Sequence, residues 1–171
     1  GGASRSREFG RTTGGPIWFA RMTHSGQRLA LRSSFSGIDP AFRTRSGFVN
    51  RTGDVNLAFT NILIVQGKPG GFVESFTPDI TLNGVWTYDR FKDGRGVRAP
   101  QAHFNLNATL RGGWQGGASL LLEYFSYDPR IYRNYALEAP GPGGVGLDTI
   151  PFTGGNDRIP NRDYAVSFST P

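Results

Sequence analysis

The chain contains no cysteine among its 171 residues. Disulfide bonds and thiolate metal sites are therefore excluded, and cysteine usage gives no indication of the redox compartment. Long hydrophobic runs are also missing, since the longest aliphatic stretch is Ile62–Val65 and a transmembrane helix needs ~20 residues. A membrane protein is still compatible with this pattern, because the strands of β-barrels carry apolar residues only at every second position.

Residue patterns that carry catalysis are scarce. The two histidines, His24 and His103, form no zinc-binding motif, and the sequence has neither a Gly-x-Ser-x-Gly motif nor a Walker loop. The acidic residues are scattered, and their spacing indicates no carboxylate pair of the glycosidase kind. We therefore expect no catalytic residue, no cofactor and no metal site, and we do not expect this chain to be an enzyme on its own.

The composition indicates strands joined by turns. Hydrophobic residues make up 37% of the chain and aromatic residues 13%, with 25 glycines, 11 prolines and a mean hydropathy of -0.37. This chain has too many aromatic residues for a disordered protein and too much glycine and proline for a helical one. The formal net charge of +6 is dispersed among loops, so nucleic-acid binding is not expected.

Period-two alternation of apolar and polar residues is the dominant pattern. From Trp114 to Tyr124 the even positions are apolar or small, whereas the odd positions are mostly polar or small. Glycines at 112–113 join this segment to an alternating segment upstream, which predicts a β-hairpin. Helix is expected for at most one turn, within 130–138. Strands are predicted near 16–23, 28–37, 54–66, 71–90, 100–111, 114–127 and 163–170.

Connection lengths alternate along the chain. Tight turns and longer polar connections follow one another in the order 24–27, 38–53, 68–70, 90–99, 112–113 and 128–162. In outer-membrane barrels the periplasmic turns are short and the extracellular loops are long. A soluble β-sandwich, which is the alternative fold, shows the same alternation of faces but has no reason to sort its loops by length. The pattern therefore favours a barrel.

The strand length agrees with a membrane span. The ten residue steps from Trp114 to Tyr124 correspond to ~34 Å of strand, or ~26 Å along the axis of a barrel whose strands tilt by ~40°. The apolar band of such barrels is ~25 Å tall. The expected fold class is all-β, an antiparallel up-and-down meander that forms part of a transmembrane β-barrel in the bacterial outer membrane.

We expect residues 1–171 to be a single segment of a larger barrel. About seven strands are predicted, whereas bacterial single-chain barrels have even strand numbers. The chain also begins with Gly-Gly-Ala rather than methionine and ends within a predicted strand. The prediction is therefore a fragment of a barrel rather than a complete one.

Three groups of candidate residues follow from the barrel interpretation. A candidate aromatic girdle at the membrane interfaces is formed by Trp18, Trp86, Trp114 and Tyr124. Candidate lumen-facing residues, which line a solute path or only solvate and brace the interior, are Arg28, Arg32, Asn105, Asn107 and Glu123. Candidate surface-loop contacts for lipopolysaccharide phosphates or anionic glycans are Arg43, Arg45, Phe48 and Arg51. The alternative for these arginines is local bracing against acidic residues or backbone carbonyls.

The run Asp-Pro-Ala-Phe-Arg-Thr-Arg-Ser-Gly-Phe-Val-Asn-Arg-Thr-Gly at 39–53 resembles a signature of the DUF5916 family. The family pattern of Pro-x-Phe, a spacer, Gly-Phe-Val and an arginine is matched by Pro40, Phe42, Gly47, Phe48, Val49 and Arg51. Residues 74–78, 111–114 and 161–164 are similar to the barrel repeats of this family. The resemblance implies a large surface protein of Gram-negative bacteria, in which a module like the family 9 carbohydrate-binding domains precedes an outer-membrane barrel. It implies no catalytic residue in the barrel.

The sequence thus predicts a structural and transport role, in which the barrel segment anchors a glycan-binding module and passes saccharides. Expected partners are outer-membrane lipid and lipopolysaccharide, the remainder of the barrel, and glycans, but no nucleic acid. Two alternatives stay open. The chain is part of a carbohydrate-active surface enzyme whose active site lies elsewhere, or it is a soluble β-sandwich binding module.

Overall fold

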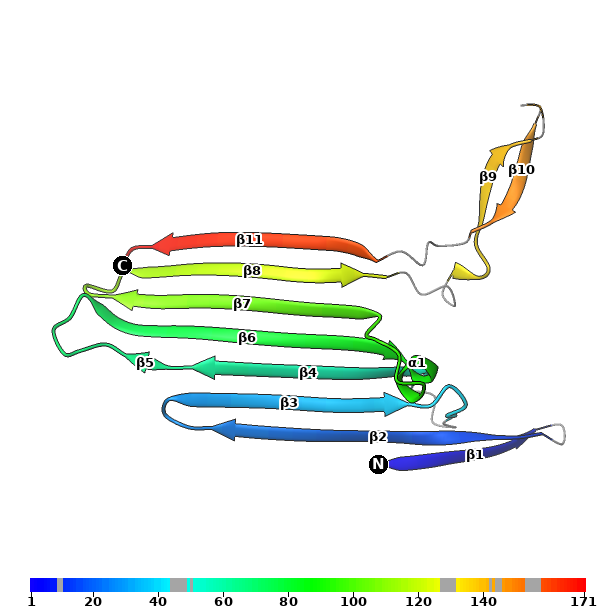
Figure 1. The fold of residues 1–171 in the computed structure, drawn as a ribbon, viewed down its shortest axis with the longest axis horizontal. Coiled ribbons are helices and arrows are strands. Elements are labelled where there is room, and N and C mark those ends of the chain that lie inside the picture. The colour runs from blue at the N-terminus through cyan, green and yellow to red at the C-terminus, as the bar shows by residue number, and fades with distance from the viewer. Residues whose placement is uncertain are drawn as a thin grey trace.

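The fold is one broad layer of antiparallel strands (Figure 1). The structure, a computed structural model, describes residues 1–8, 11–43, 49, 51–126, 132–141, 143, 146–152 and 158–171. Its strands are β1 (Gly2–Glu8), β2 (Arg11–Ser25), β3 (Leu29–Ile38), β4 (Asp54–Leu63), β5 (Val65–Gln66), β6 (Val73–Thr87), β7 (Ala99–Leu110), β8 (Gln115–Phe125), β9 (Ala136–Pro140), β10 (Leu147–Pro151) and β11 (Ile159–Ser169). A short helix, α1 (Tyr88–Lys92), follows β6. The predicted all-β, antiparallel up-and-down fold is confirmed.

The main sheet has nine strands in the order β1-β2-β3-β4-β6-β7-β8-β11, with β5 pairing to β6. All of these pairs are antiparallel. Among the residues that the structure describes, β1 pairs only with β2 and β11 only with β8, so the sheet is open at both edges. β9 and β10 form a separate hairpin that projects away from the main sheet (Figure 1).

From β2 onward, connections are sorted by length between the two ends of the sheet, as the sequence predicted (Figure 1). The exception is the unpredicted β1–β2 hairpin, whose strands are only two residues apart in the sequence at the end that otherwise carries long connections. The tight turns after β2, β5 and β7 lie at one end, the short-turn end. In the last of these turns, Gly112 and Gly113 have φ angles of 84° and 83°, which glycine adopts without steric cost. The longer connections after β3, β6 and β8 lie at the opposite end, the long-connection end. The turn of the predicted β7–β8 hairpin thus lies at the short-turn end, as the predicted loop asymmetry requires.

Several elements differ from the prediction. The strand β1 was not predicted, because it shows no apolar alternation. The predicted strand 16–23 is longer in the structure, where β2 runs over Arg11–Ser25 and its first half pairs with β1. The path through the main sheet therefore includes eight strands rather than about seven, and the argument from an odd strand number no longer applies. The predicted strand 54–66 is interrupted at Ile64, where the register places Leu63 opposite Pro78. Proline has no N–H to donate to the ladder.

The predicted long connections also contain regular structure. The predicted strand 71–90 ends at Thr87, and the chain continues as α1. The predicted connection 128–162 contains the β9–β10 hairpin. Where the sequence allowed one helical turn at 130–138, Tyr132 is helical and a turn follows it, in which the Tyr135 N–H donates to the Tyr132 carbonyl at 2.9 Å; residues 130–131 lie outside the described residues. Strand β9 begins at Ala136, where pairing with β10 replaces the helical spacing.

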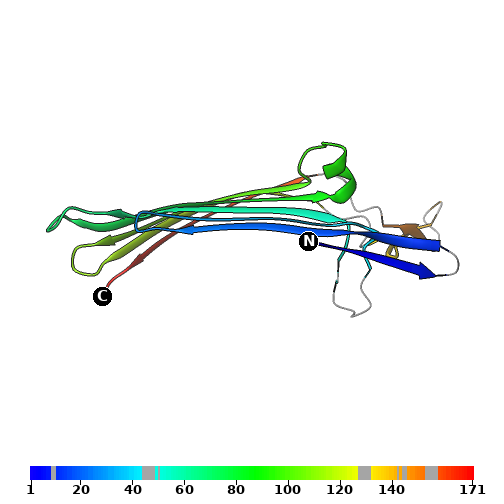
Figure 2. The same cartoon turned by 90° about the horizontal axis from the view of Figure 1, so that it is seen from below.

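The sheet is a single layer, as the edge-on view shows (Figure 2). In the described part of the chain, the buried hydrophobic side chains are those of Val55 and Tyr88. The solvent-accessible area is 12576 Å², whereas a compact monomer of 18.6 kDa exposes ~8,200 Å² by the usual scaling with mass. Large apolar side chains in mid-strand, such as Phe104 and Leu120, are 40% and 41% exposed. The fold therefore leaves one apolar surface uncovered.

Candidate functional site

The strand register sorts the side chains of the main sheet onto two faces. Residues opposite one another in neighbouring strands point to the same side, and consecutive residues point to opposite sides. The apolar face carries Trp18, Met22, Leu31, Phe35, Val55, Leu57, Phe59, Ile80, Leu82, Trp86, Phe104, Leu106, Leu120, Leu122, Tyr164, Val166 and Phe168. The polar face carries Arg21, Arg32, Ser34, Ser36, Asn56, Thr60, Asp79, Thr81, Asn83, Gln101, His103, Asn105, Asn107, Ser119, Glu123, Asn161 and Asp163. We take the polar face as the candidate functional site.

A continuous row of hydrogen-bonded side chains crosses four strands of the polar face. Asn83 Nδ2 donates to Gln101 Oε1 at 2.6 Å, and Gln101 Nε2 donates to Glu123 Oε2 at 3.0 Å. From the other side, Asn161 Nδ2 donates to Glu123 Oε1 at 2.8 Å and to Asp163 Oδ2 at 3.1 Å. These residues, which we call the amide row, join β6, β7, β8 and β11. Each of the three amide NH2 groups thereby donates at least one hydrogen bond, and both oxygens of Glu123 accept one.

Further cross-strand contacts surround the amide row. They join Asn105 Nδ2 to Asp79 Oδ1 at 2.9 Å, His103 Nε2 to Ser119 Oγ at 2.8 Å, and Thr60 Oγ1 to Thr81 Oγ1 at 3.2 Å. Most of these side chains are half-buried. Half-buried polar groups are stable when their hydrogen bonds are satisfied, so the polar face is a preorganised polar surface rather than an unsatisfied core.

The predicted lumen-facing residues lie on the polar face with one exception. Arg32, Asn105, Asn107 and Glu123 belong to β3, β7 and β8 and point to this face. Arg28 precedes β3, in the tight turn, where its carbonyl accepts a hydrogen bond from the Ile64 N–H at 2.8 Å. The strand predicted to begin at 28 begins one residue later because the turn reaches that far.

The predicted girdle residues lie at both ends of the apolar face. Trp18, Trp86 and Tyr124 lie near the long-connection end, at positions fixed by the register of β2, β6 and β8. Trp114 lies at the short-turn end and stacks on Phe168, with ring centroids 5.2 Å apart. Aromatic side chains thus border the apolar face at its two ends.

The rings near the long-connection end form a cluster under α1. Phe91 of α1 lies 6.1 Å from Trp18, 5.6 Å from Phe35 and 6.1 Å from Trp86, measured between ring centroids. We call these four residues the aromatic cluster. Trp18 covers Gly37, where an added Cβ would clash with the indole ring. The register places the fully buried Val55 between Gly37 and Trp86, so this cluster encloses the one densely packed apolar site in the described sheet.

The loop arginines make local contacts. Arg43 Nη1 donates to the carbonyls of Pro40 and Phe42, both at 2.9 Å, and its backbone N–H donates to Ser4 Oγ at 2.8 Å. Arg51 forms an ion pair with Asp54. These contacts are the bracing that the sequence offered as an alternative to ligand binding. Arg45 and Phe48 lie outside the described residues.

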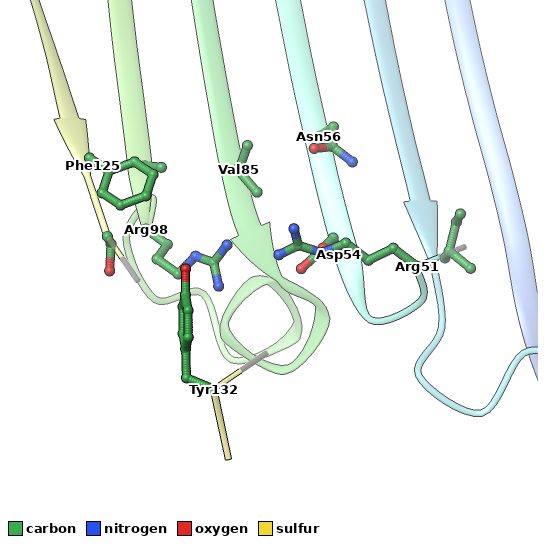
Figure 3. Close-up of a pocket in the computed structure, with 10 residues that line it drawn as sticks. Arg51, Asp54, Asn56, Val85, Arg98, Phe125 and Tyr132 are labelled. Carbon is green, nitrogen blue, oxygen red and sulfur yellow. The ribbon is translucent and has the colours of Figure 1, made fainter. Parts of the chain in front are cut away.

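A hollow of about 330 Å³ lies on the polar face near the long-connection end (Figure 3). Arg51 and Arg98 reach into it from opposite sides, and the hydroxyl end of Tyr132 points toward Arg98 (Figure 3). Its lining consists of Ile38, Arg51, Asp54, Asn56, Val85, Arg98, Ala99, Phe125, Ser126 and Tyr132. The hollow thus brings together charged and aromatic side chains from β4, β8 and the connections, which sequence reasoning did not bring together.

No cluster of three or more histidine or acidic residues in the described part of the chain could hold a metal ion. Among the described helices, none is long and apolar enough to cross a membrane.

Sequence reasoning missed Asn83, Gln101 and Asn161 of the amide row and Phe91 of the aromatic cluster. The parity of Gln101 with His103 in one predicted strand could have placed it on the polar face. Asn161 fell outside the predicted strand 163–170, and β11 begins at Ile159. The partners of these amides depend on strand register, which the sequence of each strand does not reveal.

Comparison of the chain with protein families, with curated proteins and with solved structures found no match. The resemblance of residues 39–53 to the DUF5916 family therefore stays a prediction from sequence.

Proposed function

We propose that this chain is a wall segment of a bacterial outer-membrane β-barrel, with a structural and transport role. The apolar face contacts lipid, and the polar face lines the interior. The observation that carries this proposal is the single-layer antiparallel sheet, whose uncovered apolar face lies opposite a hydrogen-bonded polar face. In barrels of this kind the strands alternate between lipid-facing apolar and lumen-facing polar residues.

The size of the uncovered face supports a lipid environment. Monomeric soluble proteins rarely expose contiguous apolar patches above a few hundred Å², whereas here apolar side chains are uncovered across β3, β4, β6, β7, β8 and β11. Within paired strands on that face, the described charged side chains are those of Arg162 in β11 and Arg5 in β1, and both lie toward the long-connection end. A charge near the membrane interface costs much less than one at the midplane.

The open edges support a larger assembly. An unpaired strand edge in hydrocarbon leaves N–H and C=O groups without partners, and closure of the sheet removes this cost. We propose that β1 and β11 pair with further strands of the barrel. A soluble β-sandwich would need a second layer over the apolar face, and the residues that the structure describes do not provide one.

Fractionation of the full-length protein tests the proposal. We expect the protein to sediment with outer membranes, to resist extraction by alkaline carbonate, and to migrate faster on detergent gels before heating than after. Recovery in the soluble fraction, together with mobility that heating does not change, would contradict the membrane assignment and favour the β-sandwich.

Liposome swelling with neutral sugars of graded size tests the transport role separately. We expect small sugars to enter and larger ones to be excluded. A heat-modifiable barrel that admits no sugar would leave the structural role intact and refute the transport role. The resemblance at 39–53 adds the proposal that the barrel anchors a glycan-binding module, which glycan pull-down with the full-length protein would test.

A further inference from the structure

Arg51, Asp54 and Arg98 line the hollow at the long-connection end of the polar face. Away from that hollow, the charged residues of the polar face are separated by sign across the sheet. Over β2 and β3 the polar face carries Arg21 and Arg32. Over β6, β8 and β11 it carries Asp79, Glu123 and Asp163. The two groups occupy opposite halves of the sheet, so the charge changes sign from one half to the other.

The negative half is held in place by neutral donors. The amides of Gln101 and Asn161 donate to Glu123 at 3.0 Å and 2.8 Å, and Asn105 donates to Asp79 at 2.9 Å. An amide donor satisfies a carboxylate oxygen without neutralising its charge. These carboxylates are therefore oriented by the wall while they keep their negative charge.

The positive half consists of two neighbouring cations. Arg21 lies opposite Ser34, and Arg32 lies opposite Thr23, which places the two arginines diagonally on adjacent strands. Both side chains are exposed. Like charges at this spacing repel each other and attract an anion between them.

We propose that the polar face sets up a transverse electrostatic field across the lumen and that the barrel prefers small zwitterions over neutral solutes of the same size. Strands β3 and β8 are four strands apart, or ~19 Å at ~4.8 Å per strand. A zwitterion places its ammonium group toward β8 and β11 and its carboxylate toward β2 and β3. This inference rests on the proposed function.

Swelling of liposomes that contain the full-length protein tests this preference, with γ-aminobutyrate as the zwitterion and erythritol as the neutral solute. We expect γ-aminobutyrate to enter faster, by up to about tenfold, because each of its two charged groups is attracted to wall charges of the opposite sign, whereas erythritol carries no charge. The preference falls as salt rises, since the screening length is ~8 Å at physiological ionic strength.

Two double variants separate the halves of the field. Arg21→Gln with Arg32→Gln removes the positive half, and Asp79→Asn with Asp163→Asn removes two charges of the negative half. Each is expected to bring the ratio of the two entry rates close to one, with heat-modifiable mobility showing that the barrel is folded. The matched control is Arg162→Gln, which removes a charge from the apolar face and leaves the ratio unchanged.

The outcomes distinguish this inference from the proposed function. Equal entry of the two solutes into wild-type liposomes overturns the zwitterion preference and leaves the pore intact. A preference that both double variants retain overturns the assignment to these residues. Liposomes that admit neither solute overturn the transport role and this inference together.

Discussion

Two adjacent leucines on β8 provide a matched test of which face meets lipid. Leu120 belongs to the apolar face and is 41% exposed, whereas Leu121 belongs to the polar face, opposite Asp163 on one side and His103 on the other. Arginine at either position adds the same charge to the same strand. Only the face differs, so the two variants Leu120→Arg and Leu121→Arg control for each other.

The expected cost follows from the position of Leu120 in the strand. It lies midway between Gln115 and Phe125, the ends of β8, which is ~13 Å from either end along the barrel axis. That places it at the centre of an apolar band ~25 Å tall, where an arginine costs ~2–4 kcal/mol. Leu121→Arg instead gains Asp163 as an opposite charge, a pair worth ~0.2–1 kcal/mol. We expect the two variants to differ by at least ~2 kcal/mol in the free energy of unfolding.

Equilibrium unfolding by urea in phospholipid vesicles measures this difference, with the fraction of the heat-modifiable gel band as the readout. Each variant is also refolded without vesicles, where a membrane barrel gives no folded band. Equal midpoints for the two variants, or a stable Leu120→Arg protein, would refute the assignment of the apolar face to lipid. Folding without vesicles would show that the sheet belongs to a soluble protein.

Further predictions concern the packing of the sheet. Gly37→Val is expected to displace Trp18 and to cost ~1–3 kcal/mol by overpacking, measured by tryptophan fluorescence during urea unfolding. Phe91→Ala uncovers the aromatic cluster and is expected to cost ~1–2 kcal/mol, less than truncation in a closed core, in the same assay. Glu123→Leu leaves two amide donors of the amide row unsatisfied, and the expected loss is ~1–3 kcal/mol; unchanged stability there would show that water replaces the carboxylate.

Local patterns in the sequence were sufficient for most strands of the main sheet and for their faces. The alternation from Trp114 to Tyr124 and the glycines at 112–113 predicted the β7–β8 hairpin that the structure contains. Period two is a local property, so it survives without knowledge of the neighbouring strands. The same reasoning placed Arg32 and Glu123 on the polar face.

Features that depend on pairing were not predictable. Strand β1 lacks an alternating pattern, and among the described strands it pairs with β2 alone. α1 follows a segment with strand-like alternation, and the position of Phe91 over three strands depends on tertiary packing. At the bulge between Val73 and Ser75 the register shifts by one residue, which a count of alternating positions does not detect.

The position of α1 has a consequence for how deeply the proposed barrel sits in the bilayer. α1 lies on one side of the sheet (Figure 2) and meets the apolar face through Phe91. A helix packed against the outer wall acts as a collar, because its backbone and charged side chains resist entry into hydrocarbon. The bilayer is then expected to adjust its thickness to the bare wall below the collar, which makes the folded protein sensitive to lipid chain length.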